Sequence, residues 1–385
     1  MNDIQNRLAL LEQQGLKRKR RIVESPQSVH LLVDAVQYLS FASNDYLGLA
    51  NHPEVIAAAH QGLAQYGLGA GASALVCGHC RAHEDLEAAL AQFVQMPRAL
   101  YFSTGYMANI GAIQSLVGPG DTVFSDRLNH ACLIDGARLS RAELKVYPHL
   151  DVVVLERLLA KCNSPRKLVL TDGVFSMDGD IAPLADILVL CERYDALLLI
   201  DDAHGFGVLG DSGRGSVSHF GLDSPRIVYM GTLGKAAGVF GAFVAGHADV
   251  IELLLQRART YIFTTASPPM LATALMASLK IIEAESWRQQ RIKALAERLQ
   301  QGLHGLRWQL LPSQTAIQAL IVGDNHLAIE LMESLRGLGI WVPAIRPPTV
   351  PDGTARFRIS LSAEHSDADI DRLIGALFSL AETEK

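Results

Sequence analysis

The sequence predicts an α/β fold in which a large domain, built on a mostly parallel β-sheet, is followed by a smaller α+β domain. Three observations support this. The chain has 385 residues, of which 49% are apolar, so it can fill more than one hydrophobic core. In its middle part, short apolar runs alternate with stretches of helical periodicity. After a long helical region at 247–304, a different order of strands and helices begins.

The first part of the chain has helical patterns. Residues 1–15, MNDIQNRLALLEQQG, have amphipathic spacing and lack the basic start and apolar core of a signal peptide. Residues 53–67, PEVIAAAHQGLAQYG, form a second helical pattern. We therefore expect an N-terminal helical arm over 1–45, and a large domain over 46–285.

The predicted sheet consists of short apolar runs bounded by polar residues. These runs are RALYF (98–102), KLVLT (167–171), ALLLIDD (196–202), RIVYM (226–230) and GAFVAG (241–246). Helical patterns such as PLADILVLCERYD (183–195) separate them. Continuous apolar strands between helices are typical of a parallel sheet covered on both faces.

The last hundred residues predict the small domain, over 286–385. A strand pattern, AIQALIVGD, is followed by a helix at 325–338, a second strand pattern, ARFRISLSA, and a final helix from Asp367. We found no repeats, low-complexity segments or long polar linkers in the sequence.

Composition limits the classes of partner. A formal net charge of -6 gives no general attraction to nucleic acid or anionic membranes, and the basic run KRKRR at 17–21 is short. Five irregularly spaced cysteines indicate a reducing compartment. No apolar run reaches the roughly 18 residues of a membrane span. We expect a cytoplasmic protein that binds neither nucleic acid nor membranes.

Three short motifs are rejected on context. GLGAGA at 67–72 follows a helical pattern, whereas a dinucleotide fingerprint follows a strand. GTLGKA at 231–236 lacks the first glycine of a P-loop and the hydroxyl residue after the lysine. CGHCRAH offers Cys77, His79, Cys80 and His83, which could bind zinc or form a redox pair. The other cysteines are scattered, so we expect buried thiols, a histidine on a helix face and no metal.

The run GTLGKAAGVFGAF, residues 231–243, surrounds Lys235 with glycine, alanine and short apolar side chains. Small neighbours let the backbone approach a ligand, and desolvation shifts an amine towards its neutral form. A neutral lysine can act as a nucleophile or form a Schiff base. A solvated lysine in a glycine-rich loop also fits this run, so the role of Lys235 depends on the rest of the chain.

Polar residues follow several predicted strands. Asp201 and His204 come directly after ALLLI, at the carboxyl end where open parallel sheets bind ligands, although a helix cap and a packed loop histidine are alternatives. Gly105 and Tyr106 lie at a strand-to-helix turn whose N–H groups suit a phosphate, or form a plain turn. His130 precedes another helix. Together with the later lysine, this order matches what pyridoxal phosphate requires.

Five separated motifs then carry a family resemblance. They are SNDYLGL (43–49), DGVFSMDGDIAPL (172–184), DDAHGFGVLG (201–210), GTLGKA (231–236) and FTTASPP (263–269). In order and spacing the sequence resembles the α-oxoamine synthases over nearly its whole length. This resemblance implies a fold-type I pyridoxal-phosphate-dependent transferase, with the aspartate aminotransferase-like fold, that condenses an amino acid with an acyl thioester.

The resemblance also implies roles for the cofactor contacts. Lys235 would bind pyridoxal 5'-phosphate covalently and act as the base at the amino acid's Cα. Asp201 would keep the pyridine nitrogen protonated. His204 and Ser176 would hydrogen-bond near the phenolic oxygen, and His130 would stack on the ring.

The phosphate of the cofactor would have its own set of contacts. By resemblance they are Gly105, Tyr106 and Thr232, together with Thr265 from a partner subunit. A homodimer with active sites at its interface is therefore expected. We count four residues as catalytic: Lys235, His130, Asp201 and His204.

Substrate contacts are implied in the same way. Arg358 would bind the amino-acid carboxylate with help from Asn44, although ARFRIS also fits an edge strand with exposed arginines. Arg18 matches by spacing an arginine for the far carboxylate of the acyl chain, or is one solvated charge in the basic run. His130, Arg346 and Thr349 would complete the substrate site. Asp172 stands where the family usually has glutamate, and we assign it no role.

The stretch AIRPPTVPDGTARFRISLS, residues 344–362, most closely resembles the branch of this family that acts in biotin biosynthesis. That branch is an acyltransferase joining L-alanine to pimeloyl-CoA or pimeloyl-acyl carrier protein, and the sequence does not choose between these carriers. The alternatives are glycine-using siblings, 5-aminolevulinate synthase or 2-amino-3-ketobutyrate CoA ligase, and a non-catalytic subunit of the same fold.

Overall fold

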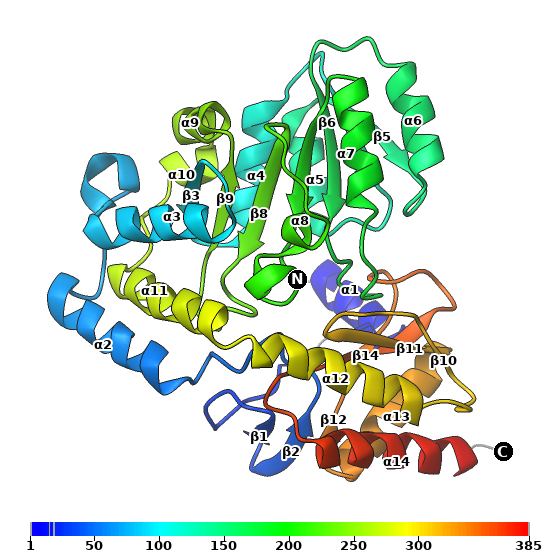
Figure 1. Ribbon diagram of the computed structural model, residues 1–385. Coiled ribbons are helices and arrows are strands. Elements are labelled where there is room, and N and C mark those ends of the chain that lie inside the picture. Colours follow the sequence, from blue (N-terminus) through cyan, green and yellow to red (C-terminus); the bar gives the residue numbers. More distant parts are fainter. Residues whose placement is uncertain (1, 15, 18–19, 384–385) are drawn as a thin grey trace.

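The computed structural model describes residues 2–14, 16–17 and 20–383. Its large domain contains a seven-stranded sheet with the order β3-β9-β8-β7-β6-β4-β5 (Figure 1). The strands of this sheet, in chain order, are β3 (Arg98–Phe102), β4 (Thr122–Asp126), β5 (Glu143–Tyr147), β6 (Lys167–Asp172), β7 (Leu197–Asp201), β8 (Ile227–Thr232) and β9 (Ala242–Gly246).

This sheet is mostly parallel, as predicted. Strand β9 alone is antiparallel to its two neighbours, β3 and β8. The five predicted runs correspond to β3, β6, β7, β8 and β9. Strands β4 and β5 were not among those runs, and β5 has a half-exposed pattern that gives little apolar signal.

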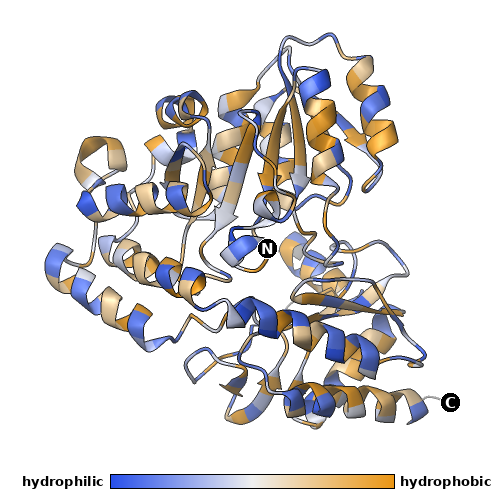
Figure 2. Ribbon diagram, viewed as in Figure 1, coloured by the Kyte–Doolittle hydropathy of each residue, from blue (hydrophilic) through white to orange (hydrophobic). Residues whose placement is uncertain are grey.

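Helices cover both faces of the sheet. Along β7, Leu198 and Ile200 pack with α3, α6 and α7, whereas Leu199 packs with α4, α5 and α9. Figure 2 shows the apolar strands between these helices, whose outer faces carry the hydrophilic residues. The helices of this domain are α3 (Arg81–Phe93), α4 (Gly105–Leu116), α5 (Ala131–Ser140), α6 (Val152–Ala160), α7 (Leu184–Arg193), α8 (Ser216–His219), α9 (Ala248–Arg257) and α10 (Arg259–Ile262), with short turns η1 (Ala74–Gly78) and η2 (Asp211–Gly213).

Two long helices, α2 (Pro53–Tyr66) and α11 (Pro269–Ala284), pack closely against each other. The Thr273 hydroxyl donates to the Ala58 carbonyl at 2.9 Å. Gly62 permits this approach, because a Cβ built there would lie 2.0 Å from the Thr273 hydroxyl oxygen. Helix α12 (Trp287–Gly302) follows α11 directly and leads into the C-terminal part of the chain.

The C-terminal part is built on an antiparallel sheet with the order β10-β11-β14-β13. Leucines of three helices pack with Phe357 and Ile359 of the sheet in one hydrophobic cluster. This agrees with the predicted α+β pattern. Besides α12, the elements are β10 (Gln309–Leu310), β11 (Ile317–Gly323), α13 (Asn325–Gly337), β13 (Ala344–Ile345), β14 (Ala355–Ser360) and α14 (Asp367–Thr383).

The N-terminal segment joins this C-terminal cluster. Strand β1 (His30–Val33) pairs with β2 (Val36–Ser40), and β2 pairs in parallel with β12 (Ile340–Trp341). Helix α1 (Asn2–Gln13) is the helical part of the expected arm; residues 30–40 instead form strands, because Leu31, Val33 and Leu39 alternate with more exposed residues and face the interior. The domain boundaries themselves stay a prediction.

The segment CGHCRAH leads into α3. Cys80 caps this helix, and its backbone N–H donates to the His83 ring at 3.1 Å. His83 is buried on the helix face, as expected, but Cys77 is exposed and Cys80 only half-buried. The expectation of buried thiols was therefore wrong, because this segment lies at the surface end of the helix. Across the described residues, none of the helices combines the length and apolarity needed to cross a membrane.

Candidate active site

A cavity of about 200 Å³ lies where strands of the large sheet end. β6, β7 and β8 contribute Asp172, Asp201 and Thr232 from their carboxyl ends, and Lys235 follows β8 in the loop before β9. Parallel strands end at one edge of a sheet, so these side chains meet although they are far apart in sequence. The cavity is lined by Gly105, Tyr106, His130, Cys132, Asp172, Ser176, Asp201, Ala203, His204, Met230, Thr232 and Lys235.

Lys235 is the first member of a hydrogen-bonded chain. Its Nζ lies 2.7 Å from His204 Nε2, and His204 Nδ1 lies 2.6 Å from the Tyr46 hydroxyl. Desolvation lowers the pKa of Lys235 to about 8, partly opposed by the nearby Asp201 carboxylate. Burial, with Lys235 and Arg358 nearby, holds the pKa of His204 well below its ordinary value. A neutral imidazole therefore faces an amine that can lose its proton near neutral pH.

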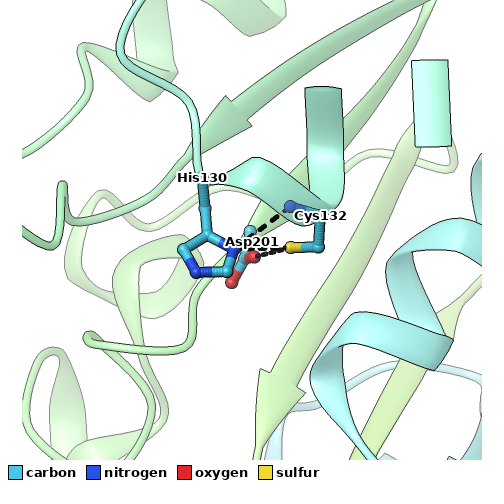
Figure 3. A group of neighbouring side chains, drawn as sticks. All are labelled: His130, Cys132 and Asp201. Carbon is cyan, nitrogen blue, oxygen red and sulfur yellow. Dashed lines mark hydrogen bonds between the residues drawn. The ribbon is translucent and has the colours of Figure 1, made fainter. Parts of the chain in front are cut away.

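Asp201 is held by buried donors. The Asn109 amide on α4 donates to its Oδ2 at 2.7 Å, and the backbone N–H of Ala203 donates to its Oδ1 at 3.0 Å. The Cys132 thiol donates weakly to the same Oδ2 at 3.6 Å (Figure 3). Burial raises the pKa of Cys132 well above that of a free thiol, so it stays protonated. The carboxylate is thus fixed with its charge directed at the cavity.

His130, Cys132 and Asp201 also bring three potential metal-ligand atoms within 4.8 Å of one another (Figure 3). His130 Nδ1 lies 2.8 Å from the Cys132 Sγ and accepts the Cys132 backbone N–H at 3.3 Å, so that it caps α5. The group is therefore better described as the hydrogen-bonded wall of the cavity.

Asp172, left without a role from the sequence, anchors the His130 loop. Its Oδ2 accepts the backbone N–H of His130 at 2.9 Å, and its own N–H donates to Asn129 Oδ1 at 3.1 Å. Burial and the neighbouring Asp201 raise the pKa of this carboxyl well above its ordinary value. The shorter aspartate thus reaches backbone rather than a ligand.

The start of α4 faces the cavity. The N–H groups of a first helical turn have no partner within the helix, so those of Gly105 and Tyr106 can bind an anion. A Cβ built on Gly105 would lie 3.8 Å from the Thr232 hydroxyl, which places both residues on one side of the cavity. The Tyr106 hydroxyl donates to Asp135, and the ring is partly exposed.

Arg358 on β14 is buried beside this cavity and connects the two parts of the chain. Its Nη1 donates to Asn44 Oδ1 at 3.1 Å and to the Ser360 hydroxyl at 2.8 Å, and its Nη2 donates to the Tyr46 hydroxyl at 3.2 Å. Its Nε donates to the Ser176 carbonyl. The prediction that Arg358 and Asn44 are neighbours agrees with this geometry. The alternative, an edge strand with exposed arginines, does not, because Arg358 is buried.

A second cavity, of about 610 Å³, shares His130 and Ser176 with the first. It runs from these residues to the loop that holds Thr349. A third, of about 480 Å³, is lined by Arg346 and Thr349 and by Leu11 of α1. The two larger cavities therefore extend from the candidate active site towards the C-terminal loop and the N-terminal helix.

Two predicted residues are not brought to this site. Thr265 pairs with Ser73 in an isolated β-bridge and lines a separate cavity with His83. Its proposed contact with a partner subunit stays a prediction. Arg18 lies outside the described residues.

Two further residues belong to the site and were missed. Asn109 and Tyr46 are both fully buried, and Tyr46 lies inside the quoted motif SNDYLGL. Asn109 follows Gly105 by one helical turn on an apolar helix, where an amide needs a specific partner. Tyr46 gives no comparable signal, because an aromatic residue in an apolar run is ordinarily core.

Comparisons with known proteins identify the family of this chain. The profile of the family described as aminotransferase class I and II matches residues 36–377. A protein of Nitrosospira multiformis named 8-amino-7-oxononanoate synthase is 60% identical over 94% of this chain and 92% of its own. One of Nitrosomonas europaea with the same name is 57% identical over 99% of both chains. The chain belongs to the 8-amino-7-oxononanoate synthase family. The predicted resemblance and the fold-type I transferase fold are confirmed.

Solved structures support the same family at lower identity. Serine palmitoyltransferase of Sphingomonas wittichii is 32% identical, covers 99% of this chain and 96% of its own, and superposes with a TM-score of 0.93. An 8-amino-7-oxononanoate synthase of Francisella tularensis is 30% identical, with coverages of 90% and 98% and a TM-score of 0.79. The 8-amino-7-oxononanoate synthase family thus shares one fold with another acyltransferase.

Proposed function

We propose that the chain condenses L-alanine with a pimeloyl thioester, giving 8-amino-7-oxononanoate, CO2 and a free thiol. The observation that carries this proposal is the junction of two cavities at His130 and Ser176. The smaller contains Lys235 and Asp201, and the larger offers room for an acyl chain. The names of relatives at 57–60% identity support the same reaction.

The residues of the smaller cavity fit pyridoxal phosphate. Lys235 would hold it covalently, the start of α4 would hold its phosphate, and the fixed Asp201 carboxylate would face its ring nitrogen. When bound, the cofactor supplies an electron sink beside the amino acid's Cα. A structure of SPT with a PLP internal aldimine superposes on this chain with a TM-score of 0.93.

Lys235 has the chemistry of a general base. Its pKa of about 8 leaves part of the amine neutral near pH 7, and His204 at 2.7 Å can exchange a hydrogen bond with either protonation state. The Tyr46 hydroxyl fixes the other ring nitrogen of His204. The lysine can therefore hold or move a proton at Cα without a change in the surrounding hydrogen bonds.

Arg358 is suited to the carboxylate of the amino acid. Its guanidinium is buried next to the cavity, and Asn44, Tyr46 and Ser176 hold it from three directions. The Nε, both Nη1 and one Nη2 N–H groups have protein partners, so the fixed guanidinium can bind a carboxylate through its charge and its remaining Nη2 N–H. Arg358 thus orients the amino acid, and Lys235 transfers the proton.

The acyl thioester is assigned to the larger cavity. Phe175, Met177 and Val350 give it apolar walls that suit a methylene chain, and Thr349 is shared with the third cavity, which Arg346 also lines. Arg18 stays a proposal for the far carboxylate. Either pimeloyl-CoA or pimeloyl-acyl carrier protein can supply the acyl group.

We also propose a cytoplasmic homodimer in which Thr265 reaches the phosphate of the partner's cofactor. In support, the surface around the bridge from Ser73 to Thr265 exposes Leu75, Val76 and Phe263. Exposed apolar residues gathered in this way are typical of a contact surface.

Steady-state assays test the reaction. L-alanine and glycine would each be combined with pimeloyl, succinyl and acetyl thioesters, and release of the free thiol measured. The highest kcat/KM is expected for L-alanine with a pimeloyl thioester. A preference for glycine with a succinyl or acetyl thioester would instead place the chain with the sibling activities.

A further inference from the structure

His149 follows β5 and joins two carboxylates that belong to different parts of the large domain. Its Nδ1 lies 3.0 Å from Asp126 Oδ1, at the end of β4, and its Nε2 lies 2.7 Å from Asp180 Oδ2. Both ring nitrogens are therefore occupied by acceptors. Only the protonated imidazole donates to both at once.

The Asp126 end of this bridge is rigid. The side chain is buried, and it also accepts the backbone N–H of Leu128 at 2.8 Å and of Leu150 at 2.9 Å. Leu150 is the residue after His149, so the carboxylate fixes the backbone that carries the ring. The position of β4 thus determines the position of the imidazole.

The Asp180 end belongs to a tight turn over residues 174–181. Val174 and Ile181 pair across it, and the Phe175 N–H donates to the Asp180 carbonyl at 3.0 Å. The rings of Phe175 and His149 meet edge-on, with centroids 4.4 Å apart. The Ser313 hydroxyl holds the turn from the C-terminal domain through the Gly179 carbonyl at 2.9 Å. The side chain of His149 connects this turn to β4, through hydrogen bonds to Asp180 and Asp126.

This turn carries Ser176 into the active site. Ser176 lines both cavities, and its carbonyl accepts the Nε of Arg358. The next residues of the turn include Asp178, which pairs with Arg356. A displacement of the turn would therefore change the direction of a hydrogen bond to the guanidinium that faces the amino acid.

We propose that His149 is a positioning residue for the amino-acid carboxylate: by bridging Asp126 and Asp180, it fixes the turn whose Ser176 carbonyl orients Arg358. This rests on the proposed function, in which Arg358 binds that carboxylate. His149 touches neither substrate nor cofactor and acts through the turn.

The charge of the bridge agrees with this role. Burial alone would lower the pKa of His149, but its hydrogen bonds to Asp126 and Asp180 raise it to about 9. The further carboxylate near the ring is that of Asp178, which is neutralised by Arg356. At neutral pH the ring is a cation between two carboxylates. Above about pH 9 it can donate to only one of them.

The test uses the cofactor-loaded enzyme without thioester. Binding of L-alanine is followed through the change in cofactor absorbance, in wild type, His149→Gln and Asp180→Asn. Both variants are expected to weaken L-alanine binding about tenfold or more, the effect of losing one charge-assisted hydrogen bond. His247→Gln is the matched control, because His247 is also a histidine paired with a carboxylate, that of Asp249 at 3.6 Å, and lies outside the site. It should bind L-alanine as wild type does.

A pH series separates positioning from general stability. From pH 7 to pH 10, the ratio of the dissociation constants of His149→Gln and wild type should fall towards one, because wild type loses the imidazolium. Ionisation of L-alanine and of Lys235 changes the dissociation constants of wild type and His149→Gln by the same factor, so it cancels in this ratio. Binding within twofold of wild type in both variants would overturn the proposal, and so would a ratio that stays constant with pH. A wild type that binds only glycine would contradict the proposed function, and the same ratio measured with glycine would still test His149.

Discussion

Replacement of Asn109 by alanine should slow the reaction without removing the cofactor. The Asn109 amide donates to Asp201 at 2.7 Å, and both side chains are almost completely buried, so water cannot replace the lost donor. A hydrogen bond to a charged group contributes about 1.5–3 kcal/mol. Asp201 keeps the Ala203 N–H at 3.0 Å, which favours the lower half of that range. We expect kcat/KM for L-alanine to fall about 10- to 50-fold.

The matched control is Ser115→Ala on the same helix. Ser115 is also buried and donates to the Gly111 carbonyl at 2.7 Å, outside the cavity. Steady-state kinetics and cofactor absorbance would be measured for both variants. Asn109→Asp should be slower still, because it places a second carboxyl beside Asp201. Equal activities of Asn109→Ala and Ser115→Ala would refute the reasoning.

Four further outcomes are expected. Lys235→Ala should form no borohydride-reducible bond to pyridoxal phosphate; a stable reduced adduct in that variant would remove the assignment. Arg358→Lys should raise the KM for L-alanine about 10-fold or more and leave kcat less affected, since lysine cannot reproduce the planar contacts; an unchanged KM would contradict this. Leu373→Ala, in the C-terminal cluster, should lower the free energy of unfolding by about 2–5 kcal/mol in urea titrations. Burial lowers the pKa of His365 to about 4, so as pH falls from 6.5 this histidine takes up a proton in the unfolded chain before it does so in the folded chain. The stability that His365 contributes is therefore present above pH 6.5 and is lost towards pH 4. His365→Gln should reduce this dependence of the free energy of unfolding on pH.

The large sheet could be predicted because its strands are buried on both faces. Residues 168–170 and 227–230 are continuously apolar, and the strands that contain them end only one or two residues beyond the predicted runs. β5 and the N-terminal strands were harder. β5 and β1 lie at sheet edges, and β2, although it lies between β1 and β12, is exposed at its first residues; such half-exposed patterns resemble that of a loop. β1 and β2 also depend on a partner, β12, that lies about three hundred residues later in the chain.

Some residues of the candidate site could likewise be predicted from the sequence, and others could not. Lys235, Asp201 and His204 follow strands, so their meeting at one sheet edge followed from the sequence order. Asn109 acts from a helix behind that edge, and its contact with Asp201 depends on how α4 packs. The role of Asp172 depends on the direction of one carboxylate towards a backbone N–H, which no residue pattern encodes.

The pairing of β2 with β12 also bears on how the chain folds during synthesis. Leu39 leaves the ribosome early, and its partner Ile340 leaves about three hundred residues later. Closing so long a loop is entropically costly unless the intervening chain has already become compact. The large domain can fold first and bring the two ends together. On a translating ribosome, the hydrophobic cluster of Leu39, Phe41 and Ile340 should therefore be the last to become resistant to protease.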